Sequence, residues 1–440
     1  MRRLLALGLI IVVFSVWFGL TTWGQPLEIW IRSVYYPPFN EWLKSKILEW
    51  SEQTGVEVNV SIISDYLLDE KLINAIETRV TPDIIFNAES GVTLALEAGL
   101  AVPLEDVVDR LGRDDFYPLA LQAYALTDLE TGQKFVYAIP MFFEFGYWYI
   151  RTDLLEAAGM EIPEEPTWEW LVEAAKAMNN PPEVYGLGIP ISPSYDALNV
   201  FAFLLYHYGG GFITELAPGG ADIFNTEPTW RLFEDLKQLY KDEIIPPDAV
   251  SWTDFDNNLS YMEGRIATTW NPGSIMGAML KQNHPLIPYT KMIAIPPISL
   301  GGECVFVFKS TPEREAHCKD LICYVFSDKE TYRVKSADEA GLYGVPIFKS
   351  QGAIISQKYE AGEFPFLGSD PMVPIARGEA FFGTNVPYPY GEATSVFEAA
   401  ASSFQITAMM GPLFIKDADP KQVAQDISLW LNARLTAAAR

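Results

Sequence analysis

The first hundred residues alternate between short apolar runs and longer segments with a helical spacing of apolar positions. Residues 27–31 are mainly apolar, and residues 56–63 carry an apolar residue at every second position, so both segments are predicted strands. Residues 40–54 have the spacing of an amphipathic helix that ends at Gly55. A helix (71–78), a strand (83–86) and a helix (93–98) are predicted to follow. This β-α-β-α-β-α order predicts a parallel sheet with helices on both faces.

The pattern becomes more aromatic after residue 140. Residues 142–150 are predicted to form one strand, which leads through Asp153 into a helix ended by Gly159. Thr167 is the expected N-cap of the next helix, with the acidic Glu169 in the first turn after it. Further predicted helices are 198–208, 229–241, 396–409 and 420–436, and further predicted strands are 264–270, 292–295 and 305–308.

An apolar segment at the N-terminus stands apart from this alternation. Arg2 and Arg3 precede residues 4–20, an almost uninterrupted apolar run without an acidic residue, and Gly24 is the candidate cleavage site. This is the layout of a secretory signal in residues 1–24, and an uncleaved membrane anchor is the alternative. In either case the rest of the chain is expected in the periplasm or outside the cell.

Charge and composition indicate which kinds of molecule this protein is not expected to bind. Without residues 1–24 the chain has 29 basic against 57 acidic residues, a net charge of −28. Nucleic acid and anionic lipid are not expected as partners, because no basic stripe is present to neutralise phosphates. The length of 440 residues predicts two or three lobes. Apolar residues at 49% and charged residues at 20% are typical of a water-soluble globule.

Motifs for metal, phosphate and nucleophilic chemistry are missing from the sequence. The three histidines are scattered, with no His-Glu-x-x-His or Cys-x-x-Cys spacing, so no metal site and no cofactor are expected. The Gly-x-Ser-x-Gly elbow, the phosphate loop and the dinucleotide fingerprint are absent as well. Cys304, Cys318 and Cys323 leave two alternatives open: a disulfide that includes Cys304, or buried free thiols.

Four stretches carry a resemblance to a known family. They are Glu52-Gln-Thr-Gly-Val-Glu-Val58; Thr81-Pro-Asp-Ile-Ile-Phe86 with 97–104 after it; Tyr137-Ala-Ile-Pro140 through Asp153 to Pro166-Thr-Trp-Glu169; and Gly264-Arg-Ile-Ala267 leading to Asn271-Pro-Gly273. In this order, behind a secretory signal, they resemble the bacterial ABC-transporter solute-binding proteins, the large family that includes maltose-binding and other sugar-binding proteins.

The resemblance implies an α/β fold of the periplasmic-binding-protein type, a two-lobed clamp in which each lobe is a doubly wound, mostly parallel sheet with helices on both faces. One lobe would hold residues 25–138 and 272–328, and the other 139–271 and 329–440. The implied protein is a monomer without enzymatic activity. It captures a small-molecule solute, a mono- or oligosaccharide first of all, by hinge closure and delivers it to the permease subunits of an ABC importer.

The candidate ligand groups lie in the loops after the strands, because ligands of open α/β sheets bind beyond the carboxyl ends of the strands. In the family's pattern, Glu144 falls where sugar-binding relatives place a ligand-bonding carboxylate. Carboxylates and amides bond vicinal hydroxyls, and aromatic rings stack on the apolar faces of sugars. The candidates are Tyr35, Tyr36, Asn87, Glu89, Ser90, Glu144, Tyr195, Asp196, Trp270, Asn271 and Tyr343.

The stretch Ser33-Val-Tyr-Tyr-Pro-Pro-Phe-Asn40 places aromatic rings around two prolines. Neither Pro37 nor Pro38 can donate to a sheet, so the strand is expected to stop and an irregular loop to begin. Tyr36 is then predicted at the rim of the solute site, and Phe39 in packing at the start of the helix.

Two positions depart from the family's pattern. Ser274 stands where relatives often have a tryptophan, and Asn87 replaces an aromatic residue found in maltose-binding proteins, which argues against specificity for malto-oligosaccharides.

Three other functions stay open. The same fold would bind a polyamine or betaine through rings and the carboxylates of Glu89, Glu144 and Asp196, or iron through Tyr35 and Tyr36. A secreted glycosidase would need two carboxyl groups about 5 to 10 Å apart.

Overall fold

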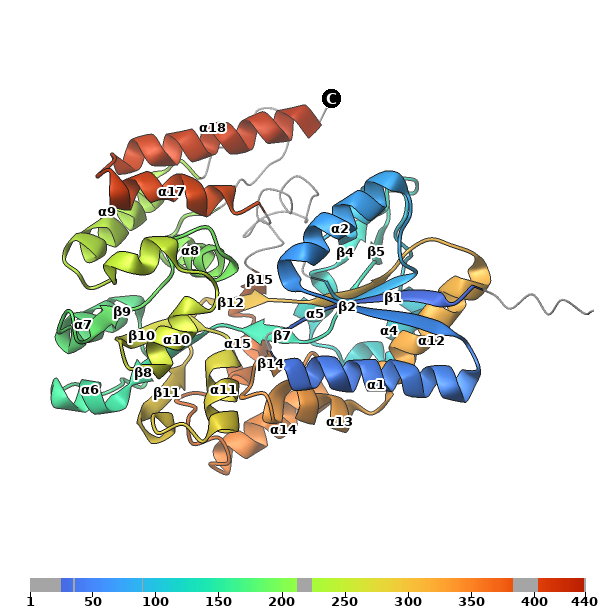
Figure 1. Cartoon of the computed structure of the whole chain (residues 1–440), viewed down its shortest axis with the longest axis horizontal. Coiled ribbons are helices and arrows are strands. Elements are labelled where there is room, and N and C mark those ends of the chain that lie inside the picture. The colour runs from blue at the N-terminus through green and yellow to red at the C-terminus, as the bar shows by residue number, and fades with distance from the viewer. Residues whose placement is uncertain (1–24, 35, 89, 212–223, 383–402, 439–440) are drawn as a thin grey trace, which may run out of the picture.

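The computed structural model describes residues 25–34, 36–88, 90–211, 224–382 and 403–438, which form two lobes joined by strands (Figure 1). A five-stranded sheet organises the first lobe, on the right of Figure 1, in the order β2-β1-β3-β13-β6. β1 pairs in parallel with β2 and β3, and β13 is antiparallel to β3. The strands are β1 (Leu27–Arg32), β2 (Val58–Ile63), β3 (Ile84–Ala88), β6 (Ile139–Pro140) and β13 (Cys304–Val307).

The predicted strand and helix alternation of the first lobe is confirmed. Helices α1 (Pro37–Thr54), α2 (Asp65–Thr78) and α3 (Val92–Glu97) alternate with β1, β2 and β3. Figure 1 shows α1 and α2 on opposite sides of the sheet. The lobe also contains α4 (Glu105–Leu111), α5 (Pro118–Gln122), the hairpin of β4 (Ala125–Thr127) and β5 (Lys134–Val136), and α12 (Pro312–Ser327), which packs on α1 and α4.

A four-stranded sheet organises the second lobe, in the order β11-β8-β10-β9. Its strands are β8 (Tyr147–Arg151), β9 (Tyr185–Leu187), β10 (Ile266–Asn271) and β11 (Thr290–Ile293). Only β9 and β10 pair in parallel, whereas β8 is antiparallel to both of its neighbours. The resemblance implied mostly parallel pairing here too. β8 departs from it by pairing antiparallel with both β10 and β11.

Helices surround the second sheet and lie beside the lobe boundary. Around the sheet are α6 (Thr152–Ala157), α7 (Trp168–Met178), α8 (Tyr195–His207), α9 (Glu227–Lys241), α10 (Asp256–Met262) and α11 (Ser274–Gln282). Later in the chain come α13 (Lys329–Arg333), a short π-helix (Val334–Asp338), α14 (Lys349–Glu360), α15 (Met372–Arg377), α17 (Gln405–Ile415) and α18 (Pro420–Ala438).

A third sheet, in the order β14-β7-β12-β15, lies where the chain crosses between the lobes. It consists of β7 (Phe143–Phe145), β12 (Ile298–Gly301), β14 (Gly344–Val345) and β15 (Ala380–Phe382). β7 leads from β6 in the first sheet to β8 in the second, and β12 leads from β11 back to β13. Residues 272–328 were predicted for the first lobe, but β11 pairs with β8 in the second sheet. Strand pairing therefore places the return crossing at β12.

Two local predictions differ from the structure. The aromatic segment 142–150 is two strands, because β7 pairs in the third sheet and β8 in the second; between them, at Gly146, a Cβ would lie 2.3 Å from the ring of Trp270. The expected irregular loop at Pro37 and Pro38 is instead the first turn of α1, with Tyr36 as N-cap. Proline suits this position because the first helical N–H groups have no partner within the helix.

Other local predictions are confirmed. The Thr167 side chain accepts a hydrogen bond from the Trp170 N–H and caps α7. Phe39 is buried at the start of α1 against Trp42 and Phe142. The helix predicted at 396–409 overlaps α17 (Gln405–Ile415) only at residues 405–409, and residues 396–402 lie outside the described part of the chain.

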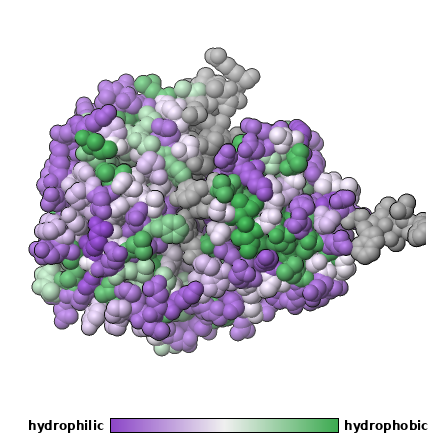
Figure 2. Space-filling model, in the orientation of Figure 1, coloured by the Kyte–Doolittle hydropathy of each residue, from purple (hydrophilic) through white to green (hydrophobic). Residues whose placement is uncertain are grey.

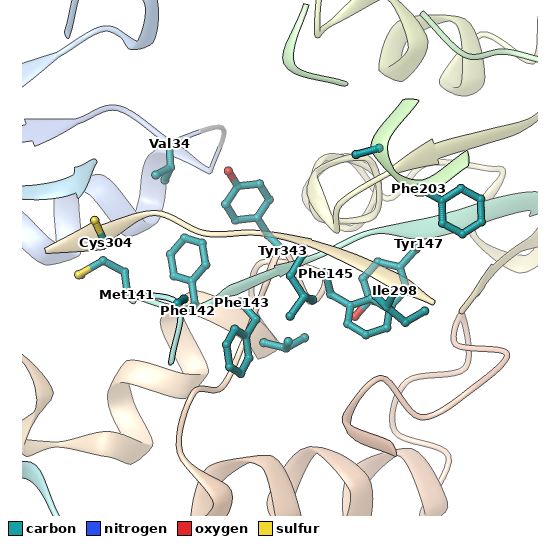
Figure 3. Packing of buried hydrophobic residues seen from close by; sticks show 14 of the residues in the cluster. Val34, Met141, Phe142, Phe143, Phe145, Tyr147, Phe203, Ile298, Cys304 and Tyr343 are labelled. Carbon is teal, nitrogen blue, oxygen red and sulfur yellow. The ribbon is translucent and has the colours of Figure 1, made fainter. Parts of the chain in front are cut away.

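The apolar core continues through the crossing strands. Figure 3 shows Phe142, Phe143, Phe145 and Tyr147 side by side along the crossing segment, and all four are buried.

All three cysteines are free; Cys304 and Cys318 are buried and Cys323 is half-buried, which resolves the cysteine alternatives in favour of thiols. Among the described residues, no helix is both long and apolar enough to cross a bilayer. Figure 2 shows polar side chains over most of the visible face, in line with the high charge.

Candidate functional site

Polar side chains from both lobes and from the crossing segment meet in one linked group, which we call the interlobe cluster. Each member contacts or electrostatically influences another, and most of them are buried. The cluster consists of Arg32, Asp69, Glu144, Tyr195, Asp196, Asn271, Glu303 and Tyr343.

An ion pair lies at the first-lobe side of the interlobe cluster. Arg32 is the last residue of β1, and its Nη1 lies 3.2 Å from Oε1 of Glu303, which directly precedes β13. Both side chains are 0% exposed. Neither residue was among the candidates from the sequence. The one signal in the sequence that could have identified Arg32 is that this charged residue follows the apolar residues 29–31 at the end of β1.

Tyr343 connects this ion pair to the crossing segment. Its hydroxyl donates a hydrogen bond to Glu303 Oε1 at 3.2 Å, and its ring meets Phe142 edge-on at a centroid distance of 5.6 Å. Figure 3 shows the hydroxyl directed away from Phe143 and Phe145. Burial raises the pKa of Tyr343 well above its usual value, and the carboxylates of Glu144 and Glu303 raise it further. The phenol is therefore a neutral donor.

Three glycines hold the loop that carries Tyr343 against the start of α11. A Cβ at Gly273 would lie 2.2 Å from the backbone nitrogen of Tyr343, and one at Gly277 would lie 2.7 Å from the Ala340 carbonyl oxygen. Gly341, at a φ of +64°, would place a Cβ 2.4 Å from the Gly277 nitrogen. Backbone therefore packs directly on backbone here, which fixes the loop to α11.

Asp196 and Asn271 form the second-lobe side of the cluster, and the amide of Asn257 contacts Asp196. Asp196 lies in the first turn of α8, and its Oδ2 accepts hydrogen bonds from Asn257 and Asn271, each at 2.8 Å. Its backbone N–H donates to Asp254. Burial raises the pKa of Asp196 well above its usual value, with further contributions from Asp254 and Glu144. The Ser274 hydroxyl donates to Asn271 Oδ1 at 2.5 Å, so the residue that replaces the family's tryptophan orients this amide.

Tyr195 and Asp69 join the two lobes directly. The Tyr195 hydroxyl donates to Asp69 Oδ2 at 2.5 Å, and the guanidinium carbon of Arg32 lies 5.8 Å from the centre of the Tyr195 ring. Ser90 donates to the other carboxylate oxygen of Asp69 at 3.1 Å. Asp69 was missed in the sequence, because it lies within a helix rather than in a loop after a strand.

The remaining candidates lie beside the cluster or outside the described residues. Tyr36 is half-buried at the N-terminus of α1, and burial, followed by Glu339, raises its pKa. Asn87 is fully buried with a φ of +59°, and its amide donates to the Arg32 carbonyl oxygen, so it supports the end of β1. The Trp270 ring is buried against Gly146. Tyr35 and Glu89 are not among the described residues.

Residues 47–364 match the family model described as "Bacterial extracellular solute-binding protein", which is well over half of the chain. The chain belongs to this family. The matched range contains every member of the interlobe cluster except Arg32.

Known proteins resemble this chain in sequence over a short segment and in fold over most of its length. A mannitol-binding protein of Pseudomonas aeruginosa strain PAO1 is 42% identical over 53 residues, 12% of this chain and 12% of that protein, so the match spans about an eighth of this curated relative. Maltose-bound MalE3 of T. maritima has a TM-score of 0.73 at 18% identity, over 92% of this chain and 98% of its own. A binding protein of Agrobacterium vitis S4 with bound D-mannitol has a TM-score of 0.72 at 16% identity, over 94% and 99%. These structures share the two-lobed clamp.

This solute-binding protein also has a surface cavity away from the interlobe cluster. The cavity measures about 490 Å³ and lies between α7, the end of α8 and α9. Its polar groups bond to one another: His207 to Glu169 at 2.9 Å, and the Tyr208 hydroxyl to Asp235 at 2.7 Å. None of the candidate ligand residues lines it.

Proposed function

We propose that this protein is the exported solute-binding subunit of an ABC importer, and that it binds a mono- or oligosaccharide or a sugar alcohol at the interlobe cluster. The observation that carries the proposal is the convergence of carboxylate, amide and phenol groups from both lobes on one buried region. Such groups are the donors and acceptors that vicinal hydroxyls require. Closure then follows because only the closed state offers contacts from both lobes at once.

The charges within the cluster favour an uncharged solute over a polyamine. Glu303 accepts from Arg32 and Tyr343, Asp196 accepts from two amides, and Asp69 accepts from Tyr195 and Ser90. Arg32 already neutralises Glu303, and the raised pKa of Asp196 favours its uncharged form, so these two acids attract a cationic solute only weakly. A polyol needs no net charge, and its hydroxyls can bond to the lone pairs that remain on the carboxyl oxygens.

The known ligands of the similar proteins support a polyhydroxylated solute. One of those proteins is a mannitol-binding protein, and the other two have maltose or D-mannitol bound. The rest of the proposed setting follows from the family and the N-terminal segment: export by residues 1–24, action as a monomer in the periplasm or outside the cell, and delivery to permease subunits. The division of the chain between the two lobes is also part of the proposal, in which the chain passes back from the second lobe to the first at β12.

A ligand panel tests the proposed function. Residues 25–440 are heated with D-mannitol, glucose, maltose, maltotriose, spermidine or betaine, because a ligand of the folded state adds about 2.7 kcal/mol of stability at a hundred times its Kd. A sugar or alditol should raise Tm. If only spermidine or betaine does so, the proposed solute class is wrong.

A variant pair then locates the binding site. Asn271→Ala should weaken binding of the active sugar about tenfold or more, since it removes an amide of the proposed site and the hydrogen bond that positions Asp196 there. Asn74→Ala, which changes an exposed amide on α2, should leave the affinity unchanged. Equal affinities for both variants would place the solute elsewhere. Hydrolysis of an aryl glycoside that is lost in Glu144→Gln would favour a glycosidase instead.

A further inference from the structure

The hydrogen bond between Asp69 and Tyr195 connects the lobes at one end of the interlobe cluster. Asp69 lies on α2, between β2 and β3 of the first sheet, and Tyr195 is the first residue of α8 in the second lobe. Their oxygens are 2.5 Å apart. A hydroxyl-to-carboxylate bond of this length is at the strong end of the range for charge-assisted hydrogen bonds.

Asp69 and Tyr195 are each contacted by one further residue, which holds the side chain in place. Ser90, which follows β3, donates to the second oxygen of Asp69 at 3.1 Å. The Tyr195 ring meets Phe404, directly before α17, edge-on at a centroid distance of 4.6 Å. The bridge is therefore built from residues of four segments.

The bridge directly adjoins the rest of the cluster. Arg32 is both the cation beside the Tyr195 ring and the ion-pair partner of Glu303. A solute that bonds to the cluster groups therefore lies next to the bridge. Two oxygens 2.5 Å apart leave no room for a sugar ring between them.

We propose that the Asp69–Tyr195 bridge closes one end of the solute site, so that the bound solute ends there. This inference rests on the proposed function and narrows its solute class. The solute is a free monosaccharide or alditol, or the terminal unit of a short chain, and an oligosaccharide that runs through the site at this end is excluded. Asp69 and Tyr195 are thus specificity-determining residues.

The test compares long with short ligands. Affinities are measured by calorimetry for D-mannitol and for glucose oligomers of one to five units with α-1,4, β-1,3 or β-1,4 linkages. In the wild type, affinity within the series that binds should fall at least tenfold once the chain exceeds the length that ends at the bridge. In Asp69→Ala, the ratio of long-chain to short-chain affinity should rise at least tenfold. The ratio is informative because a uniform weakening of closure cancels from it.

Two further variants separate the bridge from other effects. Tyr195→Ser removes both the ring and the bond and should also raise the ratio, so the result does not depend on a single variant. Glu70→Ala removes the neighbouring exposed carboxylate of α2 and should leave the ratio unchanged.

The outcomes are distinct. Equal wild-type affinity for long and short members, or a ratio that neither Asp69→Ala nor Tyr195→Ser changes, overturns the role of the bridge while the proposed function stands. If no sugar or alditol binds to the wild type or to any variant, the proposed function fails, and the role of the bridge fails with it.

Discussion

The buried pair of Arg32 and Glu303 makes the stability of this protein sensitive to the loss of either charge. The two charged atoms are 3.2 Å apart and both side chains are 0% exposed. At an effective dielectric constant of about 20, this separation corresponds to an attraction of about 5 kcal/mol, which offsets the cost of removing both ions from water. Arg32→Met or Glu303→Gln would leave one charge buried without its partner. Each should lower the free energy of unfolding by about 3–5 kcal/mol.

Urea denaturation followed by tryptophan fluorescence is the appropriate assay. Unfolding entropy of about 2.1 cal/mol/K per residue gives about 0.9 kcal/mol/K for this chain, so even 4 kcal/mol moves Tm by only about 4–5 °C. The double variant Arg32→Met with Glu303→Gln removes both charges and should recover most of the loss. Arg110→Met breaks the pair with Asp320, whose side chains are both 48% exposed, and should cost at most about 1 kcal/mol.

Two results would refute this reasoning. In the first, both single variants lose less than about 1 kcal/mol, as an exposed pair would. In the second, the double variant loses the full sum of the single losses, so that the two charges are not coupled.

Two further predictions concern the second lobe. The pKa of Asp196 is raised in the folded protein, so the folded state holds this proton more tightly than the unfolded chain, and stability falls by up to about 1.4 kcal/mol per unit as pH rises above about 4. Asp196→Asn should flatten that fall in urea titrations between about pH 4 and 7, and an unchanged slope contradicts it. Gly146→Ala should cost about 1–3 kcal/mol through overlap with the Trp270 ring. Gly411→Ala, in α17 with no atom within 4 Å of its added Cβ, should be neutral or stabilise by up to about 1 kcal/mol; equal losses for the two glycine variants would refute the steric argument.

Periodicity and capping were sufficient to predict most elements of the fold. Short apolar runs located β1 and β3, alternating apolar positions located β2, and Thr167 located the start of α7, because these signals are local. The start of α1 was misjudged because two prolines suit a first helical turn as well as a loop. The break at Gly146 was missed because it depends on which sheet each half joins, and the partner strands lie more than a hundred residues away in the chain.

The candidate site was less predictable, because pairing between distant segments builds it. Loop positions after strands led to Tyr195, Asp196, Asn271 and Tyr343, which the structure does bring together. Glu303 was missed, because 271 residues separate it from its partner Arg32 and nothing in the sequence links the two. Asn87 satisfied the loop rule, yet its amide bonds to the backbone of β1.

The contact between Gly273, Gly277 and Gly341 affects how this protein could be re-engineered. Any side chain at these positions would collide with backbone, so the segment that presents Tyr343 can neither be widened nor shifted without moving α11 as well. Variant libraries designed for a new solute should therefore leave the three glycines and the Tyr343 segment unchanged. Diversity belongs at Asp69 instead, which lies on α2, a helix with many exposed residues.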